Sequence, residues 1–188
     1  MKDFVKIFII ASSSVPLLLF GSQKEELDYK FIQEDNYYSF RATFTSKAAP
    51  DCLIDLIYNF KNIPAYALGA KSIDIGPQGE NWYEVTFTYR KLLIFENRST
   101  WRRSLKRDKH IIIFDMISNR NNIGIVPEML SSTGYYRIWP KGEGCLVEYF
   151  QECRLKPGPL KEIYINRAKK EAIKFLQVFK KFIDRICE

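Results

Sequence analysis

Histidine is almost absent from this chain of 188 residues: His110 is the only one, and after a charged turn it is expected at the surface rather than as a catalytic base. The four cysteines form no C-x-x-C pair, so neither residue type offers the ligand cluster of a zinc site. The G-x-S-x-G, H-E-x-x-H and phosphate-loop motifs of hydrolases, metalloproteases and nucleotide-binding proteins are also missing. We therefore expect no metal and no cofactor.

The few cysteines leave two redox states open. Cys145 and Cys153 fall on one predicted strand, about 26 Å apart at about 3.3 Å per residue, so they cannot pair with each other. Cys52 and Cys187 lie at the ends of predicted helices. A disulfide between these two in an oxidising compartment and free buried thiols are equally compatible with the sequence.

Long apolar runs are scarce. The longest, Phe4–Phe20, is interrupted by serines and by Pro16 and is marginal for a transmembrane helix. With Lys2 and Lys6 at its start and small or polar residues after it, the run has the layout of a secretory signal peptide.

These features predict the organisation of the chain. Residues 1–22 are expected to be a signal peptide or a retained N-terminal anchor, residues 23–36 a polar lead-in without a fold of its own, and residues 37–188 a single domain. Either form of the N-terminus places the domain outside the cytoplasm, in the periplasm or the extracellular space. A cytosolic protein is the least favoured alternative.

The net charge of +7 is unevenly distributed. Residues 97–110 and 159–188 are the basic segments, and the remainder is slightly acidic. Solvated lysines on an exposed helix face are the ordinary explanation. The alternative is an anionic membrane surface as a partner. No nucleic-acid-binding module is recognisable, so we expect no nucleic-acid partner, and we predict no oligomeric state.

Aromatic residues are abundant, with fourteen Phe, eleven Tyr and three Trp. They are compatible with a thick core or with a cavity lined by rings. Eleven phenols are more than a dry core of this size readily satisfies, because buried hydroxyl groups need hydrogen-bond partners or water. Their number favours the cavity.

Hydrophobic periodicity predicts the order of the elements. One strand is followed by two short helices, six strands and one long helix. The segment Ser118–Glu128 is the longest irregular stretch and is a candidate loop or lid. The expected strands are 38–45, 71–75, 82–89, 92–105, 110–117, 131–139 and 145–155, and the expected helices are 50–60, 60–68 and 159–186.

The last helix has one wide apolar stripe, opposite a face rich in lysine and arginine. Pro157, Gly158 and Pro159 break the preceding strand and start the helix. The stripe comprises Leu160, Ile163, Tyr164, Ala168, Ala172, Phe175, Leu176, Phe179, Phe182, Ile183 and Ile186.

This order of elements resembles the START-like superfamily, the polyketide cyclase/dehydrase and lipid-transport (SRPBCC) group. The resemblance covers about Tyr38 to Cys187, and its most family-like pieces are YSFRATFTSKAAPDCLIDLIYNF and GYYRIWPKGEGCLVEYFQECRLKPGPLKEIYINRAKKEAIKFL. It implies an α+β helix-grip fold. In this fold a curved antiparallel sheet of about seven strands has two short helices after its first strand, and a long C-terminal helix packs across the sheet.

The resemblance also implies an apolar cavity between the sheet and the long helix, with its mouth near the short helices. For each single aromatic residue an ordinary place in the core is the favoured explanation. The residues whose alternation would turn them toward such a cavity are Phe44, Tyr58, Tyr66, Phe87, Tyr89, Trp101, Tyr136, Tyr149, Phe175 and Phe179, with Asn97 as a polar group that could orient a ligand.

Asp115 is the most unusual acid, because it stands within an otherwise apolar strand. If it faced the cavity it could transfer protons, whereas an outward position, or a pair with Arg102, would make it structural, which we favour. The leading hypothesis is a binding or transport protein for a lipid or other hydrophobic small molecule. The alternatives are a cyclase- or dehydratase-type enzyme that uses Asp115 or a tyrosine on a polyketide-like or aromatic ligand, and an interaction module with a filled cavity.

Overall fold

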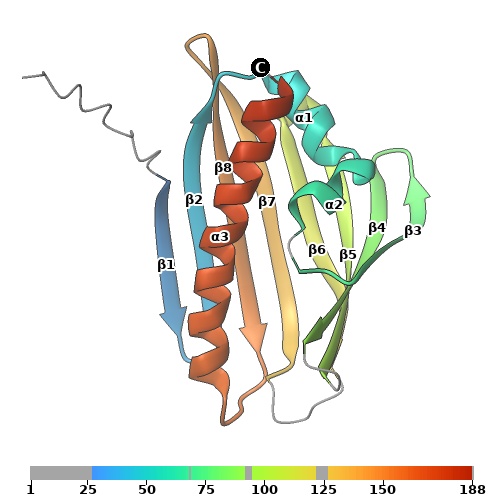
Figure 1. Cartoon of the computed structure of the whole chain (residues 1–188), viewed down its shortest axis with the longest axis vertical. Coiled ribbons are helices and arrows are strands. Elements are labelled where there is room, and N and C mark those ends of the chain that lie inside the picture. The colour runs from blue at the N-terminus through green and yellow to red at the C-terminus, as the bar shows by residue number, and fades with distance from the viewer. Residues whose placement is uncertain (1–26, 68, 92–94, 122–126, 188) are drawn as a thin grey trace, which may run out of the picture.

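The computed structural model describes residues 27–67, 69–91, 95–121 and 127–187 (Figure 1). The predicted signal peptide or anchor lies outside these residues. The elements are β1 (Asp28–Glu34), β2 (Tyr37–Ser46), α1 (Pro50–Tyr58), η1 (Phe60–Asn62), α2 (Ile63–Tyr66), β3 (Ser72–Gly79), β4 (Trp82–Lys91), β5 (Phe95–Lys106), η2 (Arg107–Lys109), β6 (Ile111–Asn121), β7 (Met129–Lys141), β8 (Gly144–Leu155) and α3 (Lys161–Cys187).

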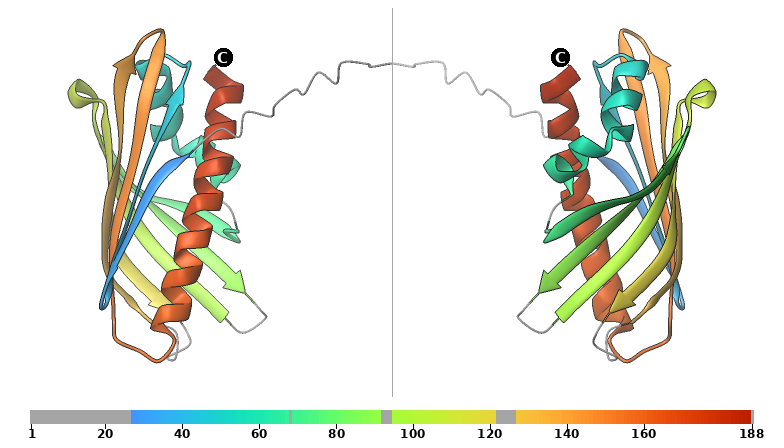
Figure 2. Two further views of the ribbon diagram at one scale, coloured as in Figure 1. Left: turned by 90° about the vertical axis from the view of Figure 1, so that its left-hand side faces the viewer. Right: turned by 90° about the vertical axis from the view of Figure 1, so that its right-hand side faces the viewer.

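The strands form one antiparallel sheet in the order β1-β2-β8-β7-β6-β5-β4-β3. Figure 2 shows that the sheet curves around α3, which crosses its concave side, while α1 and α2 cover the same side near the C-terminal end of α3. The predicted α+β helix-grip fold is confirmed, with eight strands where about seven were expected.

Local sequence explains the two elements that begin the domain. In β2, Phe40, Ala42 and Phe44 are buried, because they face α3 and the short helices, while Arg41 and Thr45 between them are exposed. Pro50 stands in the first turn of α1, where its missing N–H costs no helical hydrogen bond.

The predicted polar lead-in, residues 23–36, differs from the prediction because part of it forms a strand. Asp28–Glu34 forms β1, which pairs with β2 at the edge of the sheet. The ring centroids of Tyr29 and Phe40 lie 5.7 Å apart, as do those of Phe31 and Tyr38. Nearly all of β1 is exposed, so the strand carries no alternating burial pattern that the sequence could reveal.

Two further boundaries also differ. The predicted loop or lid 118–128 is partly strand, because β6 continues to Asn121 in register with Asn97 of β5, and residues 122–126 lie outside the described residues. The second expected helix, 60–68, is divided into η1 and α2, and Pro64 stands in the first turn of α2. In α3, Ile163 is exposed and Ile165 is buried instead.

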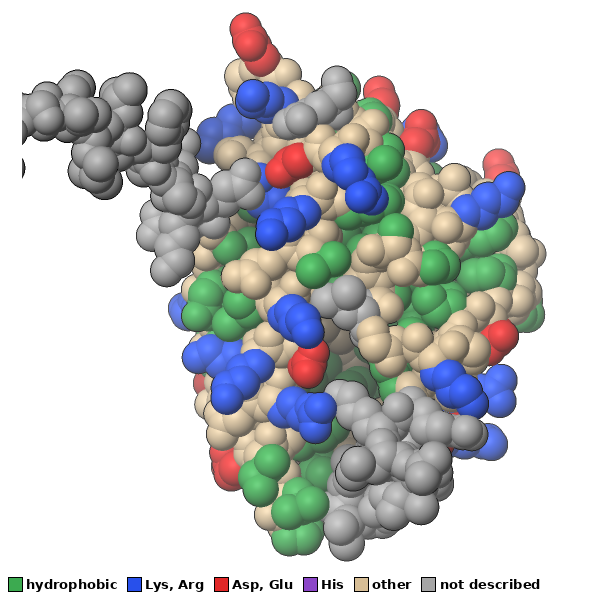
Figure 3. Space-filling model, viewed as in Figure 1, with side chains coloured by type: hydrophobic (Ala, Val, Ile, Leu, Met, Phe, Trp, Pro, Cys, Tyr) green, Lys and Arg blue, Asp and Glu red, His purple; other side chains and the backbone are tan. Residues whose placement is uncertain are grey.

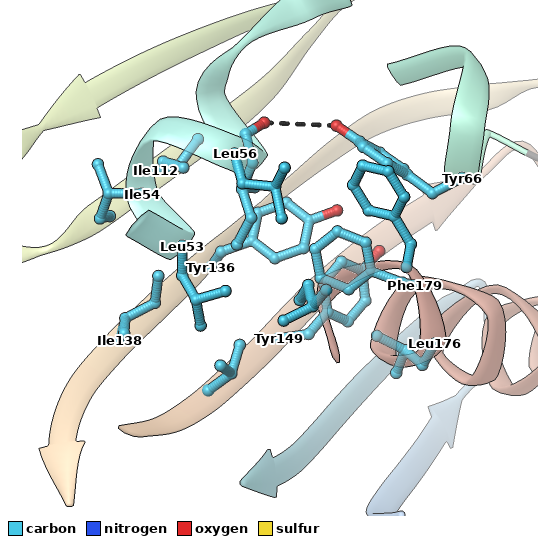
Figure 4. Packing of buried hydrophobic residues seen from close by; sticks show 14 of the residues in the cluster. Leu53, Ile54, Leu56, Tyr66, Ile112, Tyr136, Ile138, Tyr149, Leu176 and Phe179 are labelled. Atoms are coloured by element: carbon cyan, nitrogen blue, oxygen red, sulfur yellow. Dashed lines mark hydrogen bonds between the residues drawn. The ribbon is translucent and has the colours of Figure 1, made fainter. Parts of the chain in front are cut away.

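The core is concentrated at the C-terminal half of α3. Leu176, Phe179 and Ile183 are fully buried there, in one cluster with the apolar face of α1 and with residues of β2, β7 and β8 (Figure 4). A smaller cluster holds the first turns of α3 against the sheet, through Ile165 and Leu155. A middle stretch of α3 lies between Ile165, which is buried in the smaller cluster, and Leu176, which is buried in the larger one.

A disulfide joins Cys52 of α1 to Cys187 at the end of α3, with the two Cα atoms 6.4 Å apart. This finding decides between the two redox states that the sequence left open. Cys145 and Cys153 are free and buried, and they do not pair with each other, as predicted. Within the described residues no helix is long and apolar enough to span a bilayer.

Candidate ligand-binding cavity

A cavity of about 590 Å³ lies between the concave face of the sheet and the N-terminal half of α3. This volume is within the range of about 300–1,000 Å³ that is typical of sites for small molecules. Figure 3 shows a hollow beside α3, with lysine and arginine side chains around it. Strands β4 to β8, the segment after α2 and one face of α3 form the wall.

Small side chains on α3 leave room for the cavity. Ala168 and Ala172 stand one turn apart on the face toward the sheet, between Ile165 and Leu176, which pack into the two core clusters. Because a methyl group does not reach the sheet, a space remains between them and the strands. Phe175 closes this space toward the core, with its ring centroid 5.7 Å from that of Tyr149.

Aromatic rings from four neighbouring strands form the opposite wall. The ring centroid of Trp101 on β5 lies 6.0 Å from that of Phe114 on β6, and Phe114 lies 5.5 Å from Tyr136 on β7. Tyr136 lies 5.2 Å from Tyr149 on β8. These offset and tilted contacts are favourable and make a continuous apolar surface.

The buried phenols remain protonated at neutral pH. Burial raises the pKa of Tyr89 to about 12, and it raises the pKa of Tyr136 and Tyr149 further, with the Arg103 charge opposing part of the shift for the last two. Tyr89 and Tyr136 are therefore neutral groups that can donate hydrogen bonds to a ligand.

One wall residue carries a buried charge. Arg103 on β5 is only 5% exposed, and its Nη1 donates to the hydroxyl of Tyr66 at 2.9 Å. Its guanidinium lies over the ring of Tyr136, 5.7 Å from the centroid, and Tyr83 faces it from β4. The Nη2 atom of Arg103 and the hydroxyl of Tyr83 are buried and have no hydrogen-bond partner among the described residues.

Other polar groups on the wall satisfy one another. Asn119 Nδ2 donates to Asn97 Oδ1 at 2.9 Å, and Trp101 Nε1 donates to Ser99 Oγ at 3.0 Å. The hydroxyl of Tyr149 donates to Gln151 Oε1 at 2.6 Å. These pairs hold the side chains in place, whereas Nη2 of Arg103 is buried without a partner among the described residues.

The structure brings eight of the eleven residues proposed from the sequence to the cavity wall. They are Tyr66, Phe87, Tyr89, Asn97, Trp101, Tyr136, Tyr149 and Phe175.

The other three lie elsewhere. Phe44 and Phe179 pack edge to face in the core, with their centroids 6.4 Å apart, and Tyr58 packs against Tyr83 at 5.2 Å. Alternation and helical spacing identified the inward face correctly for Phe44 and Phe179. These patterns could not show that α1 and α2 fill the space beneath that half of α3.

Asp115, the candidate for proton transfer, lies on the outer face of the sheet. It is exposed, accepts a hydrogen bond from Thr133 and stands opposite Arg102 on β5. Arg102 itself pairs with Glu84 at 2.8 Å. The favoured structural role fits this position.

The sequence-based reasoning missed Arg103, which it counted only within a basic segment. The signal was present, because the inward alternation Asn97, Ser99, Trp101 continues to Arg103. Arginine is seldom buried, so composition placed it at the surface. Gln151 of β8 was missed for the same reason. The described residues contain no group of three metal-ligating side chains.

Comparison with known proteins places this geometry in a fold family. Searches with family models and among curated proteins found no match to the sequence. Among solved structures, the Zhui aromatase/cyclase from Streptomyces superimposes with a TM-score of 0.64 and 10% identity, over 78% of this chain and 91% of the other. The chain has a START-like fold.

Two further structures show the same fold. A STAR-related lipid transfer protein from Xanthomonas axonopodis has a TM-score of 0.59 and 9% identity, over 82% of this chain and 98% of its own. A START superfamily protein from Mycobacterium smegmatis has a TM-score of 0.59 and 11% identity, over 79% and 98%. The START-like fold predicted from the order of elements is thus confirmed, and it is shared by proteins named for lipid transfer and for cyclisation.

Proposed function

We propose that this START-like chain binds, and thereby transports, a lipid or another hydrophobic small molecule in the cavity under α3. The observation that carries the proposal is the aromatic wall over a space of about 590 Å³. The apolar surface of a ligand buried there would contribute about 2.5 kcal/mol per 100 Å², offset in part by the cost of immobilising the ligand.

The position of Asp115 supports a binding protein rather than an enzyme, because this acid, the candidate for proton transfer in the sequence, faces away from the cavity. The neutral phenols of the wall suit hydrogen bonding to a bound molecule. The lipid transfer protein among the similar structures supports the same class of function.

We also propose that the ligand is loaded from an anionic membrane outside the cytoplasm. Arg167 and Lys174 stand at the cavity on the exposed side of α3, where basic side chains would contact lipid headgroups. The disulfide between Cys52 and Cys187 supports an oxidising compartment, because such bonds seldom persist in the cytosol.

The test of the proposed function is identification of what the protein carries. The chain would be purified without detergent and extracted with organic solvent, and the extract analysed by mass spectrometry. We expect one class of hydrophobic molecule at close to one per chain. If extracts of many preparations contained none, and no hydrophobic compound bound to the purified chain, the proposal would be wrong.

A further inference from the structure

We propose that the ligand is an amphiphile with an anionic head, a carboxylate or a phosphate, and that Arg103 binds this head while the apolar tail lies along the aromatic wall. This inference rests on the proposed function and specifies the chemical class of its ligand. The evidence is the state of the Arg103 guanidinium, which is charged and buried on the wall of the cavity.

Arg103 has no negative partner in the described part of the chain. A guanidinium stays protonated at any physiological pH, and buried charges in proteins are normally paired. The groups with the largest electrostatic effect on Arg103 are Tyr66, Tyr83 and Tyr136, and none of these is a carboxylate. Glu171, the one acid on the cavity wall, lies 3.9 Å from Arg167.

The remaining internal residues provide no acid either. Residues 68, 92–94 and 122–126 contain neither Asp nor Glu. Tyr83 and Tyr136 do not neutralise the charge as phenolates, because burial raises the pKa of Tyr83 to about 12 and raises that of Tyr136 as well. The buried positive charge of Arg103 is therefore uncompensated by the described residues, and the internal segments between them contain no acid that could compensate it.

Part of the hydrogen-bonding capacity of this group is also unused. Nη1 of Arg103 donates to the Tyr66 hydroxyl, which is itself 3.4 Å from the carbonyl oxygen of Ile57, so this side of the guanidinium is fixed. Nη2 has no acceptor, and the Tyr83 hydroxyl across the strand pair has no partner. A planar guanidinium with one unpaired N–H group is suited to donate hydrogen bonds to the oxygen atoms of a carboxylate or a phosphate.

The strand that carries Arg103 also indicates the path of the tail. Its inward residues run from Arg103 through Trp101 and Ser99 to Asn97, about 20 Å at about 3.3 Å per residue. Phe87 on β4 and Phe114 on β6 flank this line on the wall. An extended apolar chain with its charged end at Arg103 would therefore contact rings along its length.

The test compares ligands that share a tail and differ in the head. Palmitate, hexadecyl phosphate and hexadecan-1-ol would each displace the neutral fluorescent probe N-phenyl-1-naphthylamine from the purified chain. Hydrogen bonds to a charged group are each worth about 1.5–3 kcal/mol, so we expect at least one anion to bind about ten- to a hundredfold more tightly than the alcohol. The two anions distinguish a carboxylate from a phosphate site.

Arg103→Met is expected to remove this preference and to leave the affinity for the alcohol within about threefold, since it removes the charge but keeps an unbranched apolar side chain. Arg102→Met is the matched control. Arg102 is the next residue on the same strand, its side chain is 49% exposed on the outer face, and its loss changes the net charge equally. This control is expected to keep the preference for the anion.

Each result decides a separate question. If the probe and the alcohol bind but neither anion binds more tightly in the wild-type chain, the inference is wrong and the proposed function stands. An anion preference that Arg103→Met and Arg102→Met reduce equally would also overturn it, because general electrostatics would then suffice. If neither the probe nor any of the three compounds binds, the proposed function itself fails. The wild-type comparison requires no variant, so it holds even if Arg103→Met does not fold.

Discussion

Reduction of the disulfide between Cys52 and Cys187 is predicted to cost stability without opening the ligand cavity. The bond closes a loop with a sequence separation of 135 residues. In the chain-entropy treatment, a loop of this length stabilises the folded state by about 5 kcal/mol at 25 °C. Natural domains are stable by only about 5–15 kcal/mol, so the loss is a large share of the total.

The location of the bond explains why binding should survive. It fixes the last residue of α3 to α1, at the end where Leu176, Phe179 and Ile183 also hold the helix through the core. The cavity lies beneath the other half of α3. The reduced protein should therefore remain folded in water and keep its cavity, but unfold at a lower urea concentration.

The assay is urea unfolding followed by far-UV circular dichroism, with and without a reductant. The double variant Cys52→Ser/Cys187→Ser is the control, and its unfolding midpoint should equal that of the reduced wild type and be insensitive to the reductant. An unfolding free energy that falls by less than about 1 kcal/mol would contradict the chain-entropy reasoning. Loss of probe binding on reduction, while the circular dichroism spectrum is retained, would contradict the division of α3 into a core half and a cavity half.

Three other predictions follow from the same structure. Replacement of Arg167 and Lys174 by Gln should weaken binding to vesicles that contain phosphatidylserine by about thirtyfold, at about 1 kcal/mol per basic residue, and leave binding to neutral phosphatidylcholine vesicles unchanged. If the wild type and this double variant bound equally to the phosphatidylserine vesicles in a co-sedimentation assay, the membrane proposal would be refuted. Burial raises the pKa of Cys145 and Cys153 to about 11, so the thiolate fraction at pH 8 is about a hundredfold below that of a thiol with a pKa of 9. Alkylation of these thiols by iodoacetamide in the folded state should therefore be slow and should accelerate up to about pH 11, and rapid labelling at pH 8 would show that the thiols are accessible. Asp115→Asn should change the affinity for the neutral probe by less than about threefold in a fluorescence titration, because Asp115 is exposed on the outer face; a larger loss would place it in the site.

The fold was largely predictable because its elements have strong periodic signals. The alternation in Tyr37–Ser46 reports a face that is buried along the strand, and the apolar stripe of Lys161–Cys187 reports the face of the helix that packs on the sheet. The strand Asp28–Glu34 was missed because it is held by main-chain pairing at an exposed edge and by three ring contacts, which leave no pattern in the sequence. Polar residues at the end of β6 were similarly interpreted as a loop.

The candidate site was predictable in part. Alternation placed Tyr136 and Tyr149 on the inner face correctly, but it could not separate the half of that face that α1 fills from the half that remains open. That division depends on Ala168 and Ala172, whose small size matters only once α3 has been docked on the sheet. The buried charge of Arg103 was missed because a composition-based rule assigns arginine to the surface.

The most direct test of a ligand cavity under α3 is a fluorescence titration of three proteins with N-phenyl-1-naphthylamine. The wild type should bind one probe per chain with saturation. Ala172→Phe, which places a ring in the cavity, should abolish this binding, while Gln177→Phe, which adds the same ring on the exposed side of the same helix, should retain it. Equal binding by all three proteins, with unchanged circular dichroism spectra, would contradict the cavity as the binding site.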